Sequence, residues 1–367
     1  MSFNPPPYPY ERLDAFKKIA EKFDGGPIDC SIGTPVDAPP NFVLEELAKG
    51  TGLRGYPPSI GTPQFRESCA NWMNRRFGVS LTSKDIAACI GTKEFVGNLA
   101  GYLHLRMPDR DTVLYPQVSY PTYAMGATLA GLRAVPVPMT NGRMDLNSIA
   151  AQDIERALVL WSNSPSNPTG ALDDLGAIAQ WGRSNGVLVA SDECYAEFTW
   201  ASRPRSIIEH GLDGVLAVHS ISKRSNLAGI RAGFYTGDPE IVSFLKLVRQ
   251  HAGFMVPGPV QSAVALAYDD DAHVSVQREV YLNRLTSLAS ALTNIGIEAP
   301  VPEGSFYLWC KKDGLDGWGL AEELATKCGL IVSPGEFYGS ASNEFARVAV
   351  VQTDDRLQLA IERLQDS

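Results

Sequence analysis

A lysine that directly follows a buried strand is the feature that most restricts how this chain can fold. Residues 216–219 form an apolar run that predicts a strand, and the small residues after it lead into Lys223. Lysine is seldom buried without a partner, because desolvation disfavours its charged form and lowers its pKa. A lysine amine with a lowered pKa is the nucleophile that Schiff-base chemistry needs. The position predicts a functional lysine, and a surface lysine after an edge strand is the structural alternative.

The hydroxyl and guanidinium groups around Lys223 suit a phosphate. Ser220 and Ser222 precede the lysine, and Arg231 follows it by eight residues, before a second apolar run. Such donors form strong hydrogen bonds to phosphate oxygens. An amine beside a phosphate cradle indicates pyridoxal 5'-phosphate (PLP) as the cofactor.

Short apolar runs and helical patterns alternate along the chain. The runs lie at 86–90, 112–116 and 157–161, with polar or turn residues after each of them, and residues 186–195 are predicted as a further strand with an acid at its tip. The alternation from about residue 85 to 240 predicts an α/β sheet with helices on both faces. After the interruption at Pro257-Gly258-Pro259, residues 261–295 are predicted as one long helix.

Composition excludes several classes of protein. The net charge of −9 argues against nucleic acid as a partner, and the six cysteines and five histidines are scattered without metal-ligand spacing. No apolar run approaches the roughly 18 residues that a membrane span needs. The first 22 residues lack the apolar core of a signal peptide, which leads us to expect a cytoplasmic location.

Three further patterns carry chemistry of their own. Gly91-Thr92-Lys93 stands between a strand and a helix, where the first helical amides form an anion site. Asp192 ends an apolar run, where it could serve a cofactor or cap a helix. Arg347 lies inside an apolar strand and needs a carboxylate partner, either a ligand or a structural salt bridge.

Together these segments resemble the class I and II aminotransferases of PLP fold type I. The stretch from Ser220 to Gly233 fills every position of that family's pattern, Ser-x-Ser-Lys-x-x-small-apolar-x-Gly-x-Arg-x-Gly. The segment Tyr56-Pro57 and the signature Asn167-Pro168-Thr169-Gly170 also match. The resemblance covers nearly the whole chain, in order, and several spaced motifs are more specific than any one of them.

The resemblance implies a role for each matching residue. Lys223, Asp192 and Tyr195 would be catalytic: Lys223 would bind PLP covalently, Asp192 would pair with the pyridinium nitrogen, and Tyr195 would bond to the phenolic oxygen. The substrate would contact Gly33, Asn167 and Arg347. The cofactor-binding set implied is Tyr56, Gly91, Thr92, Lys93, Tyr120, Asn167, Asp192, Tyr195, Ser220, Ser222, Lys223 and Arg231.

Some of these positions also have a purely structural interpretation. Gly33 could serve a turn, Tyr56 could be a loop aromatic, and Tyr120 could be a core residue beside a proline. In the family, the tyrosine at position 56 reaches across a dimer interface to the partner's phosphate, and the aromatic at position 120 stacks on the pyridine ring. A homodimer with shared sites is therefore expected.

The implied fold is a large domain with a mostly parallel seven-stranded sheet between helices, plus a smaller α/β domain built from both termini. We expect residues 1–41 to form an N-terminal arm and part of the small domain. Residues 42–256 would form the large PLP-binding domain, and residues 257–367 the C-terminal small domain.

The substrate is predicted from a closer resemblance, to the actinobacterial N-succinyldiaminopimelate aminotransferases of lysine and cell-wall biosynthesis. It rests on residues 222–229, the proline-rich start before residues 10–13, and the length of 367 residues. It implies a ping-pong reaction with glutamate as donor and N-succinyl-2-amino-6-oxopimelate as acceptor. That acceptor would need a cation beyond Arg347, and the candidates are Lys93, Arg54 and Arg224.

Other functions remain open on the same scaffold. A broad-range aminotransferase for aromatic amino acids, glutamine or alanine would want an apolar pocket, with Phe337 and Tyr338 as possible walls. A C–S lyase would use the same cofactor. A PLP-sensing regulatory module is disfavoured, because the charge is negative and no helix-turn-helix segment is recognisable.

Overall fold

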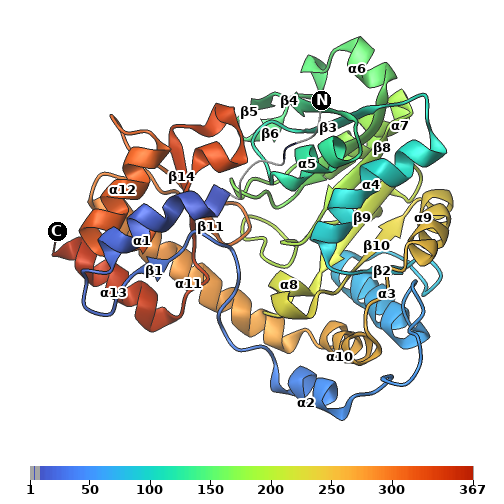
Figure 1. The fold of residues 1–367 in the computed structure, drawn as a ribbon, viewed down its shortest axis with the longest axis horizontal. Helices are drawn as coiled ribbons and strands as arrows, with labels where there is room; N and C mark the ends of the chain where they lie inside the picture. Colours follow the sequence, from blue (N-terminus) through green and yellow to red (C-terminus); the bar gives the residue numbers. More distant parts are fainter. Residues whose placement is uncertain (1–3, 5–8, 367) are drawn as a thin grey trace.

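The chain forms two units that face each other, as the computed structural model in Figure 1 shows. The structure describes residue 4 and residues 9–366. The large unit is built on a seven-stranded sheet of order β2-β10-β9-β8-β7-β3-β4. Its strands are β2 (Ala87–Cys89), β3 (Thr112–Pro116), β4 (Arg133–Val137), β7 (Ala157–Asn163), β8 (Leu188–Asp192), β9 (Val215–Ser220) and β10 (Gly233–Gly237).

The sheet is parallel except at β10, which runs antiparallel to both β2 and β9. Every residue of β7 and β8 is buried, as expected for parallel strands covered on both faces. Asn163, Asp192 and Ser220 are the last residues of neighbouring parallel strands, with Asn163 paired in register to Asp192. Polar side chains of distant segments therefore meet at one edge of the sheet.

Helices cover both faces of this sheet. One face packs against α4 (Thr92–Arg106), α5 (Thr122–Leu129) and α9 (Pro239–His251) through residues such as Leu99 and Leu245. The other face packs against α3 (Pro63–Phe77), α7 (Leu175–Asn185) and α10 (Gly258–Asp269). The shorter α2 (Asn41–Lys49) lies against α10, and α6 (Ala151–Glu155), α8 (Ile221–Arg224) and the hairpin β5–β6 (Met139–Thr140, Arg143–Met144) complete the unit.

Early and late segments of the chain together build the small unit, on the left of Figure 1. Its sheet has the order β11-β14-β13, from Tyr307–Lys311, Phe345–Ala349 and Ser333–Pro334. The N-terminal strand β1 (Ile28–Asp29) pairs in parallel with β12 (Leu330–Ile331). Around these strands lie α1 (Asp14–Ala20), α11 (Ala272–Asn294), α12 (Gly317–Cys328) and α13 (Asp354–Gln365). The expected fold, a mostly parallel seven-stranded sheet with a smaller α/β unit from both termini, is confirmed.

The single long helix predicted over 261–295 is wrong. Two helices occur there, α10 and α11, and between them the Asp270 carboxylate accepts a hydrogen bond from the amide of His273 at 3.0 Å. α10 packs against α3 and α2, and its Tyr268 is buried in the core of the large unit. We therefore propose that the unit boundary lies near Asp270 rather than at residue 257.

Within the part of the chain that the structure describes, no helix is both long enough and apolar enough to cross a lipid bilayer.

Candidate active site

A cavity of about 870 Å³ lies at the carboxyl ends of β7, β8 and β9, between the two units. Ligands of open α/β sheets bind at this edge. It brings together most of the residues selected from the sequence: Gly33, Thr92, Lys93, Tyr120, Asn167, Asp192, Tyr195, Ser220, Ser222, Lys223, Arg231 and Arg347. Gly91 lies directly behind them, against Arg231.

Lys223 is held by the short helix α8 at the end of β9. The Ser220 hydroxyl caps this helix by accepting from the amide of Ser222 at 3.0 Å. The amine of Lys223 is half-buried and donates to the carbonyl oxygen of Gly33. Desolvation lowers the pKa of Lys223 to about 8, aided by the positive charges of Arg347 and Arg231. About a tenth of this amine is therefore uncharged at pH 7, far more than for an ordinary lysine.

The phosphate cradle combines a helix N-terminus with a guanidinium. Gly91 caps α4 with φ +69°, and a Cβ atom there would lie 2.2 Å from Nη2 of Arg231. Arg231 itself has φ +53°, and its Nη1 donates to the carbonyl of Ala228 at 2.8 Å. The amides at the start of α4 and the exposed guanidinium thus converge with the hydroxyls of Ser220 and Ser222 on one anion-binding space.

Asp192 ends β8 with both carboxylate oxygens hydrogen-bonded. Oδ1 accepts from the amide of Cys194 at 3.2 Å, and Oδ2 accepts from the hydroxyl of Tyr123 at 3.0 Å. Burial raises the pKa of Asp192, and these hydrogen bonds oppose that rise. No helix begins after Asp192, since residues 194–197 form turns, so it does not act as a helix cap.

Arg347 is 2% exposed on β14, and it projects into the cavity. Its Nη1 donates to Oδ1 of Asn167 at 2.7 Å and its Nη2 to the carbonyl of Ser31 at 2.5 Å. Among the described residues, no carboxylate lies within ion-pair distance of it, and its Nε has no hydrogen-bond partner. The structural salt bridge is therefore absent there, and a buried guanidinium facing a cavity fits a ligand carboxylate.

Aromatic residues that the sequence did not single out complete the walls. Tyr307 shares a hydrogen bond of 2.8 Å with Tyr195 through their hydroxyls, and its ring lies 4.1 Å from the Arg347 guanidinium. A Cβ atom on Gly33 would lie 2.1 Å from the Tyr307 hydroxyl, so the close approach of these segments requires glycine there. Tyr307 lies in an apolar strand, where periodicity indicates core and gives no functional signal.

Several candidates lie outside the cavity. Tyr56 is 96% exposed on the loop between α2 and α3, and Arg54 on the same loop is also exposed. The proposal that Arg224 reads a distal carboxylate is wrong, because it is buried in ion pairs with Glu197 and Asp271. Phe337 lines the cavity as expected, whereas Tyr338 does not line it and packs against Arg347.

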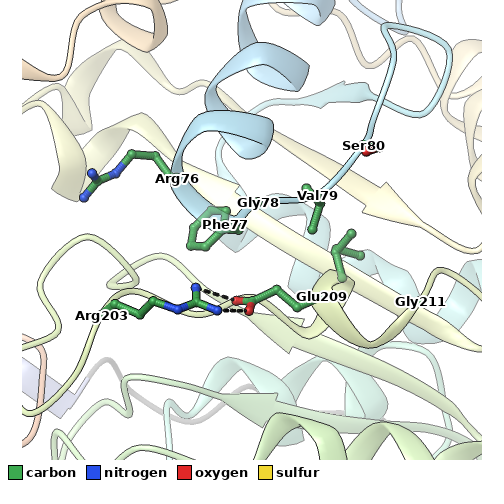
Figure 2. Close-up of a pocket in the computed structure, with 9 residues that line it drawn as sticks. Arg76, Phe77, Gly78, Val79, Ser80, Arg203, Glu209 and Gly211 are labelled. Atoms are coloured by element: carbon green, nitrogen blue, oxygen red, sulfur yellow. Dashed lines mark hydrogen bonds and ion pairs between the residues drawn. The ribbon is translucent and has the colours of Figure 1, made fainter.

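A second hollow, of about 560 Å³, lies at the end of α3 (Figure 2). Its charged groups are mostly paired: Arg203 binds Glu209, and Arg76 points away toward Glu197. None of the residues selected from the sequence lines it.

Comparison with known proteins identifies the class. The model of the class I and II aminotransferases matches residues 27–364, and the chain belongs to this family, whose members depend on PLP.

Among its relatives, the chain is 40% identical to 4-dedimethylamino-4-oxo-anhydrotetracycline transaminase OxyQ of Streptomyces rimosus, over 98% of this chain and 99% of that protein. It is 41% identical to the probable aminotransferase Rv1178 of Mycobacterium tuberculosis, over 98% and 85%. It is 32% identical to an LL-diaminopimelate aminotransferase of Dehalococcoides mccartyi, over 98% and 96%.

Solved structures agree with the fold. Substrate-bound BacF of Bacillus subtilis superimposes with a TM-score of 0.90 at 24% identity, over 100% of this chain and 98% of that one. A probable N-succinyldiaminopimelate aminotransferase of Thermus thermophilus gives 0.86 at 29% identity, over 98% and 100%.

The residues present fit PLP. The anion-binding space between Gly91 and Arg231 suits its phosphate, and the amine of Lys223 lies in the same cavity. Asp192, at the bottom of the site, suits a protonated ring nitrogen, and the Tyr120 ring offers an aromatic face. Bound there, PLP supplies an electron sink for carbanion chemistry.

Proposed function

We propose that this chain is a transaminase that moves an amino group between glutamate and N-succinyl-2-amino-6-oxopimelate in a ping-pong reaction. The carrying observation is that one cavity joins the amine of Lys223, the carboxylate of Asp192 and the guanidinium of Arg347, which has no carboxylate partner among the described residues. The substrate is supported by the diaminopimelate aminotransferase among the relatives and by the Thermus thermophilus structure.

In this proposal Arg347 binds the α-carboxylate of each substrate. Asn167 holds one side of its guanidinium at 2.7 Å, and Nε has no hydrogen-bond partner among the described residues. Lys223 accepts the α-proton as general base and returns a proton as general acid, tasks that suit a pKa of about 8. Asp192 keeps the ring nitrogen protonated, and Tyr195 is held by Tyr307 to face the phenolic oxygen.

The distal carboxylates require a further cation. Lys93 is exposed on the first turn of α4 and lines the cavity, so it is the candidate we retain. Arg54 lies outside the cavity of its own chain, and it could serve only in a partner subunit.

A second candidate is an aminotransferase for bulky apolar or aromatic substrates. The cavity has a wall of apolar side chains from four segments, and this wall favours it: Tyr10, Ile32, Met125, Leu129 and Phe337. The relative OxyQ is named for a ring-bearing substrate of this kind. No residue of the cavity specifically favours the C–S lyase.

One set of assays tests both the choice of substrate and the transaminase reaction itself. With 2-oxoglutarate as acceptor, we expect a higher kcat/KM for N-succinyl-LL-diaminopimelate than for phenylalanine or alanine. Lys93→Ala should lower the first value more than the other two. A preference for phenylalanine, unchanged by Lys93→Ala, would replace the diaminopimelate proposal by the second candidate. Lys223→Ala should abolish turnover and the visible absorption of bound cofactor, and retained steady-state activity would overturn the transaminase itself.

Assembly and location belong to the same proposal. The exposed Tyr56 and its neighbour Leu53, 96% and 74% exposed, suit a face covered by a second copy in a homodimer. All six cysteines are free, which suits the reducing cytoplasm.

A further inference from the structure

Asp192 is held by a second side chain that the proposed reaction does not use. The hydroxyl of Tyr123, on α5, donates to Oδ2 of Asp192 at 3.0 Å. The amide of Cys194 donates to Oδ1 at 3.2 Å, so each carboxylate oxygen has one fixed donor. Asp192 and Tyr123 are 6% and 1% exposed, so water competes little for this bond.

Packing fixes the Tyr123 ring. It stacks on Trp161 of β7 with centroids 5.0 Å apart and an angle of 21°. The ring of Tyr120 meets it edge-on at 5.8 Å, so the same turn carries the ring-facing aromatic and the donor to the acid. Burial raises the pKa of Tyr123 well above its ordinary value, so the phenol stays protonated and can only donate to the carboxylate.

Other ionisable groups also interact electrostatically with Asp192. They are Cys89 on β2, Cys194 on the turn after β8, His219 on β9 and Lys223 on α8. A hydrogen bond to a carboxylate favours its ionised form and so weakens its affinity for a proton. A carboxylate with weaker proton affinity leaves a shared proton on its partner.

We infer that Tyr123 is a positioning residue that, through Asp192, keeps the shared proton on the pyridine nitrogen of PLP. The inference rests on the proposed function, because it assumes that Asp192 faces that nitrogen. It also gives α5 a part in the chemistry that no sequence motif indicated.

The test measures the protonation of the ring directly. Holoenzyme loaded with PLP that is ¹⁵N-labelled in the ring is compared by NMR as wild type, Tyr123→Phe, and the protein with 3,5-difluorotyrosine at position 123. Phenylalanine removes the donor, whereas the fluorinated phenol has nearly the same shape and donates more strongly. We expect ring protonation to fall in the order difluorotyrosine, tyrosine, phenylalanine.

The visible absorption gives a second readout. A positive ring charge lowers the pKa of the cofactor chromophore, so the pH midpoint of its colour change should rise by about one unit in Tyr123→Phe. Tyr235→Phe is the matched control, because Tyr235 is a buried, stacked tyrosine of the same core cluster that does not line the cavity.

The outcomes separate the two proposals. Shifts in the Tyr123 proteins that exceed the Tyr235→Phe control support the inference. Unchanged ring protonation across the Tyr123 series overturns the inference. The proposed function then still stands, provided that the wild-type protein binds PLP with a protonated ring. If Tyr123→Phe fails to fold, the difluorotyrosine protein decides alone. A wild-type protein that binds no PLP would instead overturn the proposed function.

Discussion

Lys223 keeps its amine in surroundings that disfavour charge, and this has a consequence for stability as well as reactivity. Its pKa is about 8 in the folded protein, against 10.5 for an ordinary lysine. Between these values the unfolded chain binds more protons than the folded one, so folding becomes more favourable as pH rises. Below about pH 8 Lys223 is protonated in both the folded and the unfolded state. The cost in folding free energy of burying its charge is then fully present and no longer changes with pH.

We therefore predict that the cofactor-free protein gains stability from about pH 8 to 10, and that Lys223→Met loses this gain. Methionine fills a similar volume without a charge. Urea unfolding at several pH values measures the difference between the two proteins, which cancels the contributions of other groups. Parallel stability curves for the two proteins would contradict the prediction.

Arg347 differs from Lys223 because its charge is never lost and its contacts are fixed. We predict that Arg347→Gln lowers kcat/KM for both amino donor and acceptor by about a hundredfold, corresponding to about 3 kcal/mol for a charge-assisted bond. PLP affinity should stay unchanged. Arg347→Lys keeps the charge but not the fork, so it should recover only part of the loss. Equal loss of cofactor and substrate binding would assign Arg347 a structural role.

At the residue scale, an ionisable residue in a segment predicted to be buried is the sequence signal that indicates a functional residue. Lys223, Asp192 and Arg347 stand out because each is ionisable within or beside an apolar run. Tyr123 and Tyr307 do not stand out, because a buried tyrosine is common in a core and its polar partner comes from another segment. Arg224 shows the reverse error: it follows the key lysine in sequence, yet the short helix turns it into the core.

At the element scale, the helix N-terminus at Gly91 depends on a conformation that other residues avoid. We predict that Gly91→Ala raises the dissociation constant of PLP at least about tenfold, because a Cβ there displaces Arg231. Gly78→Ala is the control: Gly78 also has φ +69°, but nothing lies within 4 Å of its Cβ position. That variant should lose about 1 kcal/mol of stability and no PLP affinity. Equal PLP affinity in both variants, measured by equilibrium titration, would refute the role of Gly91 and Arg231 in binding the phosphate.

The elements that the sequence predicted best are the central strands. β3 matches its predicted range, and β2, β7 and β8 lie within a few residues of theirs, because strands buried on both faces read as continuous apolar runs. β4 was not predicted from pattern, since Pro136 interrupts it. Its place at the end of the sheet order is where proline is tolerated. The break between α10 and α11 was missed because helical periodicity does not register a two-residue interruption.

At the scale of the whole molecule, the proposed homodimer makes cofactor binding depend on protein concentration. If Tyr56 reaches the partner's phosphate, Tyr56→Phe should weaken PLP binding by about 1.5–3 kcal/mol, the value of a hydrogen bond to a charged group. Wild-type protein diluted until it dissociates, as followed by analytical ultracentrifugation, should show the same weakening. A fully active wild-type monomer would refute both the shared site and the role of Tyr56.

The pairing of β1 with β12 also restricts the order in which parts of the chain can fold during translation. Ile28 finds its partner Leu330 about 300 residues later, which is roughly 15 to 60 seconds of translation at about 5–20 residues per second. The phosphate cradle and the reactive lysine all lie between residues 91 and 231, and they emerge well before Arg347. The nascent chain can therefore assemble its cofactor-binding half while the carboxylate clamp is still unsynthesised, and β1 can pair only once β12 has been made.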